Sequence, residues 1–307
     1  MSNVSPIDAP ALEANVKAAQ RKKPAKLPKE KSRANWIVRT AIVLIVVGFM
    51  IPALGLLVTS FRTREDATTT SWWGALFSPL NQDWTLSGYQ EVMASGMANA
   101  FVNTLVVTVP AVVIPILIAA MAAYAFTFIE FPGRDVTFII VVGLLVIPMQ
   151  VAFIPLLNLF GLFDLVGTFP AVWLTHTGFG MPLAVFLLRA YMSTLPKAVI
   201  ESAKIDGATH YQTFWRLILP MSVPALASFA IFQFLWVWND LLVALIFLGA
   251  GENETVTLNL QSLLGVYADR WDLLAPGAFI TMALPLIVFF ALQRFFVRGM
   301  TAGSVKG

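Results

Sequence analysis

Residues 195–208 read LPKAVIESAKIDGA, and the chain returns to apolar sequence with LILP at residues 217–220. This polar loop separates two apolar segments, near 168–190 and 217–248. Each segment has at least the roughly 20 residues that cross the hydrocarbon core of a bilayer. A charged loop between two segments of membrane length predicts a chain that spans the membrane on either side of the loop.

The loop itself carries the signals of a first short helix. Pro196 suits the first turn of that helix, because its missing N–H would be unpaired there anyway. Leu195, Val199 and Ala203 recur at four-residue spacing and predict a modest apolar stripe.

A second short helix is expected directly after the first. Gly207 can adopt a positive φ and so end the first helix. Asp206 is expected to cap the second helix, which we expect to run to Trp215. The loop therefore predicts a helix–turn–helix at the membrane surface.

The composition extends this interpretation to the whole chain of 307 residues. It is 58% hydrophobic and 12% charged, whereas soluble domains carry about 25% charged residues. The predicted fold class is an all-α membrane protein with six transmembrane helices. We expect these helices near 36–60, 99–128, 136–160, 168–190, 217–248 and 275–296.

Three regions follow from these segments. Residues 1–35 are predicted to be a disordered basic tail, because they are polar and carry eight Lys and Arg residues. Residues 36–298 form the membrane domain, which includes the loop at 191–216. Residues 299–307 form a second short tail.

Prolines interrupt most of the apolar segments. Such breaks are tolerated in membranes when neighbouring groups satisfy the freed carbonyls. They predict either kinked helices around an internal path or kinks that only shape packing, and both interpretations stay open. The prolines are Pro52, Pro110, Pro115, Pro148, Pro155, Pro182, Pro220, Pro224 and Pro285.

The distribution of basic residues predicts the orientation. Sixteen Lys and Arg residues fall in the two tails and in the loops at 129–135 and 189–216, against three in the opposite loops. Basic loops stay on the cytoplasmic side. Both termini are therefore expected in the cytoplasm of a prokaryote, with the chain passing several times through its inner membrane.

Several kinds of chemistry are excluded by the residues present. The chain has no cysteine and two histidines, so we expect no metal site and no thiol chemistry. A net charge of +3 is too small to indicate nucleic-acid binding. No P-loop sequence occurs, so the chain is expected to be no enzyme and to bind no cofactor; ATP hydrolysis needs a separate partner.

A few polar groups lie inside the predicted spans. Asp240 follows Asn239 and is flanked by Trp236 and Trp238. Aromatic faces beside amide and carboxylate groups suit a sugar, because a pyranose has an apolar face and a hydroxyl rim. Two other interpretations stay open: Asp240 is solvated near the outer half, or Asn239 and Asp240 hold helices together by hydrogen bonds.

Two further groups could line a translocation path. His176 lies between two threonines in the fourth segment, and Gln150 follows a proline that opens the backbone. For His176, a hydrogen-bonded packing role is the alternative.

The loop resembles that of the membrane subunits of binding-protein-dependent ABC importers. Their hallmark is Glu-Ala-Ala, three residues, Gly, nine residues, then Ile-x-Leu-Pro. Glu201, Gly207 and Pro220 fall at those spacings, while Ser202 replaces Ala and Leu217 replaces Ile. The IDGA at 205–208, the WND at 238–240 and the terminal GMTAGSVKG are similar to the carbohydrate-uptake branch, closest to the smaller permease of maltose-type systems.

This resemblance implies a type I ABC importer permease that forms half of the path for a di- or oligosaccharide, with an α-glucoside as one candidate within that class. The implied partners are a second related permease, two cytoplasmic ATPase subunits that bind ATP and Mg, an extracytoplasmic sugar-binding protein, the sugar and the lipid bilayer. The implied coupling residues are Glu201, Ser202, Ala203, Asp206, Gly207, Leu217, Leu219 and Pro220.

Two alternatives belong to other classes. An ion-coupled secondary transporter could use Asp240 as its coupling group, although the sequence shows no inverted repeat. An intramembrane enzyme would need acid–base groups that the sequence does not place together.

Overall fold

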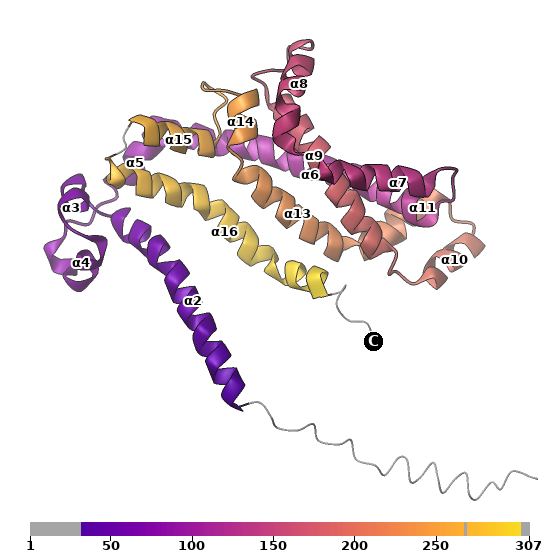
Figure 1. Cartoon of the computed structure of the whole chain (residues 1–307), viewed down its shortest axis with the longest axis horizontal. Coiled ribbons are helices and arrows are strands. Elements are labelled where there is room, and N and C mark those ends of the chain that lie inside the picture. The colour runs from indigo at the N-terminus through magenta and orange to yellow at the C-terminus, as the bar shows by residue number, and fades with distance from the viewer. Residues whose placement is uncertain (1–31, 267–268, 302–307) are drawn as a thin grey trace, which may run out of the picture. The chain divides into compact units, whose positions relative to one another are not determined.

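The computed structural model describes residues 32–266 and 269–301, and most of them are helical (Figure 1). Within those residues no β-strand occurs, and one isolated bridge joins Arg62 to Trp84. The all-α prediction is therefore confirmed. Most of the predicted tails, at 1–31 and 302–307, lies outside the described residues.

The chain divides into two units, residues 1–53 and 54–307. The described part of the first unit is the beginning of helix α2 (Ser32–Thr59), which continues into the second unit. The membrane-length part of α2, Trp36–Thr59, has a mean hydropathy of 2.9. Helix α2 matches the predicted first segment at 36–60 to within a few residues.

Four long helices organise the second unit: α6 (Ala98–Phe128), α9 (Phe169–Met192), α13 (Val223–Trp238) and α16 (Trp271–Thr301). The most extensive packing is between α6 and α9. Helix α6 continues from α5 (Ser87–Val92) through the π-helical turn η2 (Met93–Met97).

Within the described residues, four helices are long and apolar enough to cross a membrane, or up to six if each of two bent pairs is one span. Six spans therefore agree with the prediction, and two of them are bent pairs rather than single helices.

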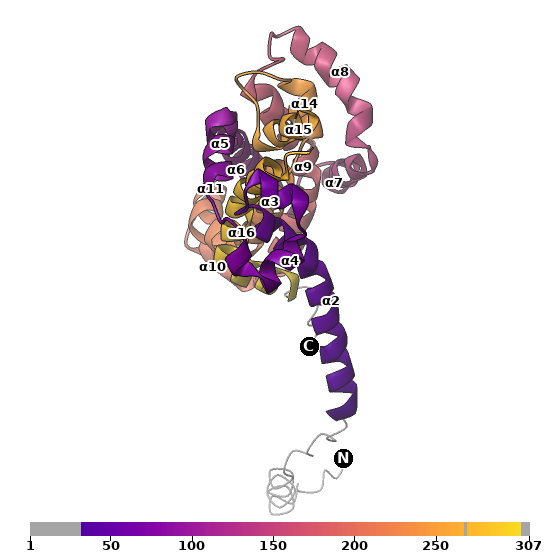
Figure 2. The same ribbon diagram turned by 90° about the vertical axis from the view of Figure 1, so that its left-hand side faces the viewer.

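The third predicted segment, 136–160, is not one helix. Helix α7 (Arg134–Gly143) and the short η3 (Leu144–Val146) meet α8 (Met149–Gly161) at an angle of 100° (Figure 2). The residue before Pro148 is forced out of the helical region, and Ile147 accordingly has ψ 117°. Hydropathy continues through this point, but the backbone cannot.

The fifth predicted segment, 217–248, is broken twice. The helical stretch His210–Met221 meets α13 at 71°, and the junction residue Ser222 has φ −89° and ψ 0°. A second break separates α13 from α14 (Leu242–Phe247). Asp240, expected inside a span, lies in this second break.

Short helices occupy the connections at the Thr59 end of α2 and between the later spans. The sequence predicted only loops there, because none of these helices is long enough to show a clear apolar period. They are α3 (Arg64–Thr69), α4 (Trp72–Phe77), η1 (Pro79–Asn81) and α15 (Val256–Val266).

Within the described residues of the second unit, 54–266 and 269–301, three hydrophobic clusters form the core. The first joins the later halves of α6 and α9 to Ile200, Phe214 and Phe229. The second joins α6 and α9 to α8 and α14. The third joins α5 and the end of α13 to α15 and the start of α16. The first cluster places the 195–220 loop on the bundle core.

Candidate functional site

The loop at 195–220 begins with helix α10 (Lys197–Ile205). Pro196 is its N-cap, one position before the expected place, with φ −61°. Gly207 ends the helix with φ +76°. The N–H of Ala208 donates to the carbonyl of Ala203 over 2.9 Å, and that of Gly207 donates to Lys204 over 3.1 Å. These two bonds form a Schellman motif, so the predicted role of Gly207 is confirmed.

Helix α10 presents one apolar face to the bundle and one polar face away from it. Ile200 and Ala203 are buried, and Ile200 belongs to the first hydrophobic cluster. Glu201 and Ser202 are exposed, and Ile205 is 86% exposed. The helix is therefore fixed to the bundle on one side and free to contact another molecule on the other.

The second helix of the loop, α11 (His210–Thr213), starts later than predicted. Its cap is Thr209, which forms a capping box with Gln212, and not Asp206. Asp206 is instead the C-cap of α10, because the Schellman turn at Gly207 must be completed before a new helix can begin.

Helix α11 leads into the π-helical η4 (Phe214–Ile218) and the single turn α12 (Leu219–Met221). Leu217 and Leu219 are half-buried, while Pro220 is exposed. The loop is bonded to α6, because Tyr124 Oη and His210 Nδ1 lie 3.0 Å apart. Two helices and this bond make the loop a defined element rather than a flexible link.

Three of the predicted path residues meet at the break between α13 and α14. His176 Nε2 lies 3.9 Å from Asp240 Oδ2, with side-chain exposures of 1% and 10%. The ring of Trp236 stands edge-on to His176, with centroids 5.2 Å apart. Asn239 is exposed beside them and donates to the carbonyl of Leu235.

Asp240 has a structural task at this place. Its Oδ2 accepts the N–H of Val243 over 2.8 Å and that of Ala244 over 3.3 Å, which caps α14. Its backbone carbonyl accepts the hydroxyl of Thr257. The remaining path candidate, Gln150, lies exposed in the first turn of α8.

Trp238 does not face a path. It is 0% exposed, stacked on Phe234 and edge-on to Phe101, and its indole N–H donates to the carbonyl of Thr281 over 2.9 Å. The aromatic residue expected beside a sugar is therefore a packing residue, because its whole surface is used inside the bundle.

That hydrogen bond belongs to a pattern that the sequence reasoning missed. Proline lacks the N–H that would bond the carbonyl four residues earlier. Pro285 thereby frees the carbonyl of Thr281, which Trp238 satisfies. Pro110 frees the carbonyl of Val106, and the indole of Trp173 donates to it over 3.0 Å.

Pro115 completes the pattern. It frees the carbonyl of Ala111, and the fully buried Gln233 donates its amide N–H there over 3.2 Å and to the carbonyl of His176 over 3.3 Å. The sequence contains both parts of this pattern, a proline inside one apolar segment and a side chain with an N–H donor in another. It does not show which donor lies beside which proline. Register between segments is what the sequence does not supply.

Gln233 is packed without spare room. A Cβ at Gly180 would lie 2.7 Å from its Nε2 and 2.8 Å from its Oε1. Among the described residues, Gln233 Oε1 and His176 Nδ1 are buried without a hydrogen-bond partner. Helices α6, α9 and α13 therefore meet at a point where a polar amide replaces apolar packing.

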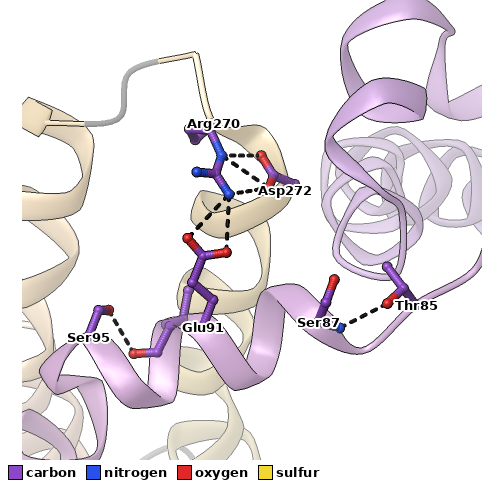
Figure 3. A network of polar contacts seen from close by, with 7 residues as sticks. Thr85, Ser87, Glu91, Ser95, Arg270 and Asp272 are labelled. Carbon is purple, nitrogen blue, oxygen red and sulfur yellow. Dashed lines mark hydrogen bonds and ion pairs between the residues drawn. The ribbon is translucent and has the colours of Figure 1, made fainter.

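An ion-pair cluster joins α5 to the start of α16 (Figure 3). Arg270 donates to Asp272 over 2.7 Å and to Glu91 over 3.2 Å. The hydrogen bonds to Asp272, and then the charges of both carboxylates, raise the pKa of Arg270. The two helices touch here, since a Cβ on Gly88 would overlap the carbonyl oxygen of Asp272.

Metal binding finds no support in the described part of the chain. Residues 32–266 and 269–301 contain no group of three or more His, Cys, Asp or Glu side chains that could hold a metal ion.

Comparison with known proteins gives the geometry its context. Residues 101–302 match the family described as the binding-protein-dependent transport system inner membrane component. The chain belongs to this family. The matched range contains the α10–α11 loop, the helices tied by the proline-freed carbonyls and the break at Asp240.

Two relatives of this permease cover much of its length. It is 51% identical over 272 residues to the osmoprotective compounds uptake permease protein GgtD of Synechocystis sp.. This match covers 88% of this chain and 91% of that protein. It is 57% identical over 230 residues to the alpha-glucoside transport system permease protein AglG of Rhizobium meliloti. This match covers 73% of this chain and 60% of that protein.

A solved structure confirms the permease fold. With a TM-score of 0.70 and 20% identity, this chain matches a chain of the crystal structure of a bacterial ABC transporter involved in the import of the acidic polysaccharide alginate. The match covers 88% of this chain and 100% of that chain.

Proposed function

We propose that this permease subunit imports a di- or oligosaccharide, with an α-glucoside as the first candidate. The observation that carries the substrate class is the 57% identity to the alpha-glucoside permease AglG. The arabinooligosaccharide permease AraQ of Halalkalibacterium halodurans, 32% identical over 89% of this chain, supports an oligosaccharide as the more general class. Family membership also argues against the ion-coupled alternative that used Asp240.

The proposal assigns transport energy to a separate ATPase that holds α10 in a groove. The buried face, with Ile200 and Ala203, is packed on the bundle, so a push on the exposed face moves the membrane helices. Glu201 and Gly207 are the central coupling residues of this proposal. Ser202, Ala203, Asp206, Leu217, Leu219 and Pro220 complete the element.

The same proposal fixes the partners and the orientation. Two ATPase subunits bind ATP and Mg, so this chain itself catalyses no reaction. A second permease completes the path, and a sugar-binding protein delivers the substrate from outside. Both termini and α10 lie on the cytoplasmic side, supported by the excess of basic residues there.

For the substrate path we propose the group at the break after α13. Trp236 supplies an aromatic face and Asn239 an exposed amide, while His176 and Asp240 lie behind them. Gln150 is the candidate from α8. Trp238 is left out of the path because it is buried.

An osmoprotective solute is the second candidate substrate. It rests on the 51% identity to GgtD, which extends over 88% of this chain. The two candidates can be separated where the osmoprotective solute is not a glycoside: uptake of an α-glucoside is inhibited by maltose or trehalose, whereas uptake of a zwitterion such as glycine betaine is inhibited by neither.

Uptake of radiolabelled substrate by cells with and without this chain tests the proposal. Labelled maltose, trehalose and sucrose are compared with labelled glycine betaine, and the chain is restored from a plasmid. We expect loss of uptake of at least one α-glucoside, with recovery on complementation. If every α-glucoside enters unchanged while glycine betaine uptake is lost, the sugar assignment is wrong and the second candidate replaces it.

A further inference from the structure

The segment Ser71–Gln82, which contains α4 and η1, exposes an apolar face. It carries no charged residue. Its exposed large apolar side chains are Trp73 at 57%, Leu76 at 52%, Phe77 at 86% and Leu80 at 97%, and Ser78, Pro79 and Asn81 are exposed beside them. We call this segment the α4–η1 foot. A contiguous apolar face of this kind on an extramembrane loop marks an interaction surface.

The foot starts at the depth of the last turn of α2. A Cβ on Gly55 would lie 3.0 Å from the indole of Trp72, so the first residue of α4 packs directly on α2 at this point. Gly55 precedes the end of α2 at Thr59 by four residues, which is about 6 Å along a helix. Helices that lie in the membrane interface sit roughly 5–10 Å deep.

One buried arginine closes the foot at both ends. Arg62 is 2% exposed and donates to the carbonyl of Thr70 over 3.3 Å, just before the segment. It also donates to Gln82 Oε1 over 3.0 Å, at the end of the segment. Burial lowers the pKa of Arg62, and the charge of Asp66 opposes that shift. The foot is thus a held structure and not a loose loop.

Its two faces have the polarity of an interfacial helix. Ala75 is 0% exposed and faces the rest of the unit, whereas Phe77 and Leu80 point away from it. Tryptophan is enriched at the membrane–water interface, where its ring is amphipathic. The exposed charged residues that flank the segment, such as Glu65 and Asp83, lie outside the uncharged stretch.

We infer that the α4–η1 foot inserts into the lipid interface at the membrane face where α2 ends. Its occupant is the boundary between headgroups and acyl chains, continuous with the lipid around the last turns of α2. The foot fixes the depth of the end of α2 in the membrane, and Arg62 holds the two ends of the foot together. This inference is independent of the transported substrate.

The absence of cysteine from the chain gives a direct test. Phe77→Cys and Leu80→Cys each receive a nitroxide spin label in the full chain, reconstituted in phosphatidylcholine–phosphatidylglycerol nanodiscs. Both side chains are exposed, so the substitutions leave the packing unchanged. Collisions with oxygen, which concentrates in lipid, are compared with collisions with nickel ethylenediaminediacetate, which stays in water. Glu65→Cys, exposed on α3, is the matched control.

We expect the oxygen-to-nickel collision ratio at positions 77 and 80 to exceed that at position 65 severalfold, both in the full chain and in the assembled transporter. Ratios at 77 and 80 equal to that at 65 would place the foot in water and overturn the inference. Shielding from both reagents in the assembled transporter would show a protein on this face, and would overturn it equally.

Discussion

At the scale of single residues, the structure solves the problem that proline creates inside a membrane helix. Each freed carbonyl in an apolar medium costs free energy unless a donor reaches it. Trp173, Gln233 and Trp238 each donate to such a carbonyl on a neighbouring helix. Pro110 and Pro115 in α6 and Pro285 in α16 therefore mark places where a neighbouring helix donates a hydrogen bond to the freed carbonyl.

Replacing Gln233 with leucine tests this account. The carbonyl of Ala111 would lose its donor inside the bundle, so we expect a destabilisation of about 1–3 kcal/mol. Thermal unfolding of the purified chain in nanodiscs should show a lower Tm. Phe232→Leu, on an exposed position of the same helix, is the control and should leave the Tm nearly unchanged. Equal Tm values for Gln233→Leu and the wild type would contradict the role of the amide.

Gly180→Ala tests the close contact at the same amide. The added methyl group would lie within 2.8 Å of both polar atoms of Gln233. Overpacking of this kind costs about 1–3 kcal/mol. Because the clash is with one side chain, Gln233→Ala should relieve it, and a double-mutant cycle should show strong non-additivity. Additive effects of the two substitutions would show that they act separately.

At the scale of elements, α10 is a short helix whose two faces have different partners. Ile200 and Ala203 hold it to the bundle, while Glu201 and Ile205 face outward. The Schellman turn at Gly207 and the capping box at Thr209 fix the corner that follows. A helix that is packed on the bundle and held at its C-terminal corner can transmit a displacement to the bundle.

Gly207→Pro and Glu201→Lys test this role. Proline fixes φ near −65°, whereas Gly207 needs +76°, so the corner would be lost. The lysine reverses the charge on the exposed face. We expect both variants to insert in the membrane and to lose sugar uptake while ATP hydrolysis by the partner continues.

Gly207→Asn is the matched control, because asparagine adopts positive φ more readily than most residues and nothing lies within 4 Å of the added Cβ. It should keep most of the uptake. Full uptake by the proline and lysine variants would remove the coupling assignment from α10.

The Arg270 cluster gives another prediction about elements. Asp272 has a side-chain exposure of 8%, against 53% for Glu91. A buried charged hydrogen bond contributes about 1.5–3 kcal/mol, and an exposed ion pair about 0–1 kcal/mol. Asp272→Asn should therefore lower the Tm clearly, while Glu91→Gln lowers it little. The reverse order would mean that the bond from Arg270 across to Glu91 of α5 contributes more than the local bond to Asp272.

The sequence predicted the long helices better than the breaks between them. Hydropathy runs on through Ile147 and Asn239, so a window of apolar residues joins what the backbone separates. Pro148 carried the local signal for the first break, but Pro110 and Pro115 lie inside an unbroken helix. Proline alone therefore does not distinguish an unbroken helix from a break.

The candidate site was predictable where it depends on local sequence, and it was not predictable where it depends on contacts between helices. The spacing of Glu201 and Gly207 located α10, and the Gly207 turn follows from backbone freedom alone. The cap of α11 was assigned to Asp206 instead of Thr209, since the turn needs more residues than the pattern suggested. Gln233 was missed because its partners come from two other helices.

At the scale of the whole molecule, the second unit is a bundle of helices joined by side-chain hydrogen bonds, with the α10–α11 loop packed on it. Side-chain donors link α6 to α9, α6 to α13, and α13 to α16. The α10–α11 loop packs on the same bundle through Ile200 and Phe214. A force on α10 is therefore expected to move these helices together. A permease that is driven by a separate ATPase subunit requires such a connection.

Reconstitution in proteoliposomes tests this central claim most directly, with the chain alone compared with the complete transporter. The account predicts that the complete transporter accumulates sugar only when ATP reaches the ATPase, and continues when ion gradients are collapsed. It predicts no accumulation by the chain alone, with or without an imposed proton or sodium gradient. Accumulation of sugar against its gradient by the chain alone would contradict the account.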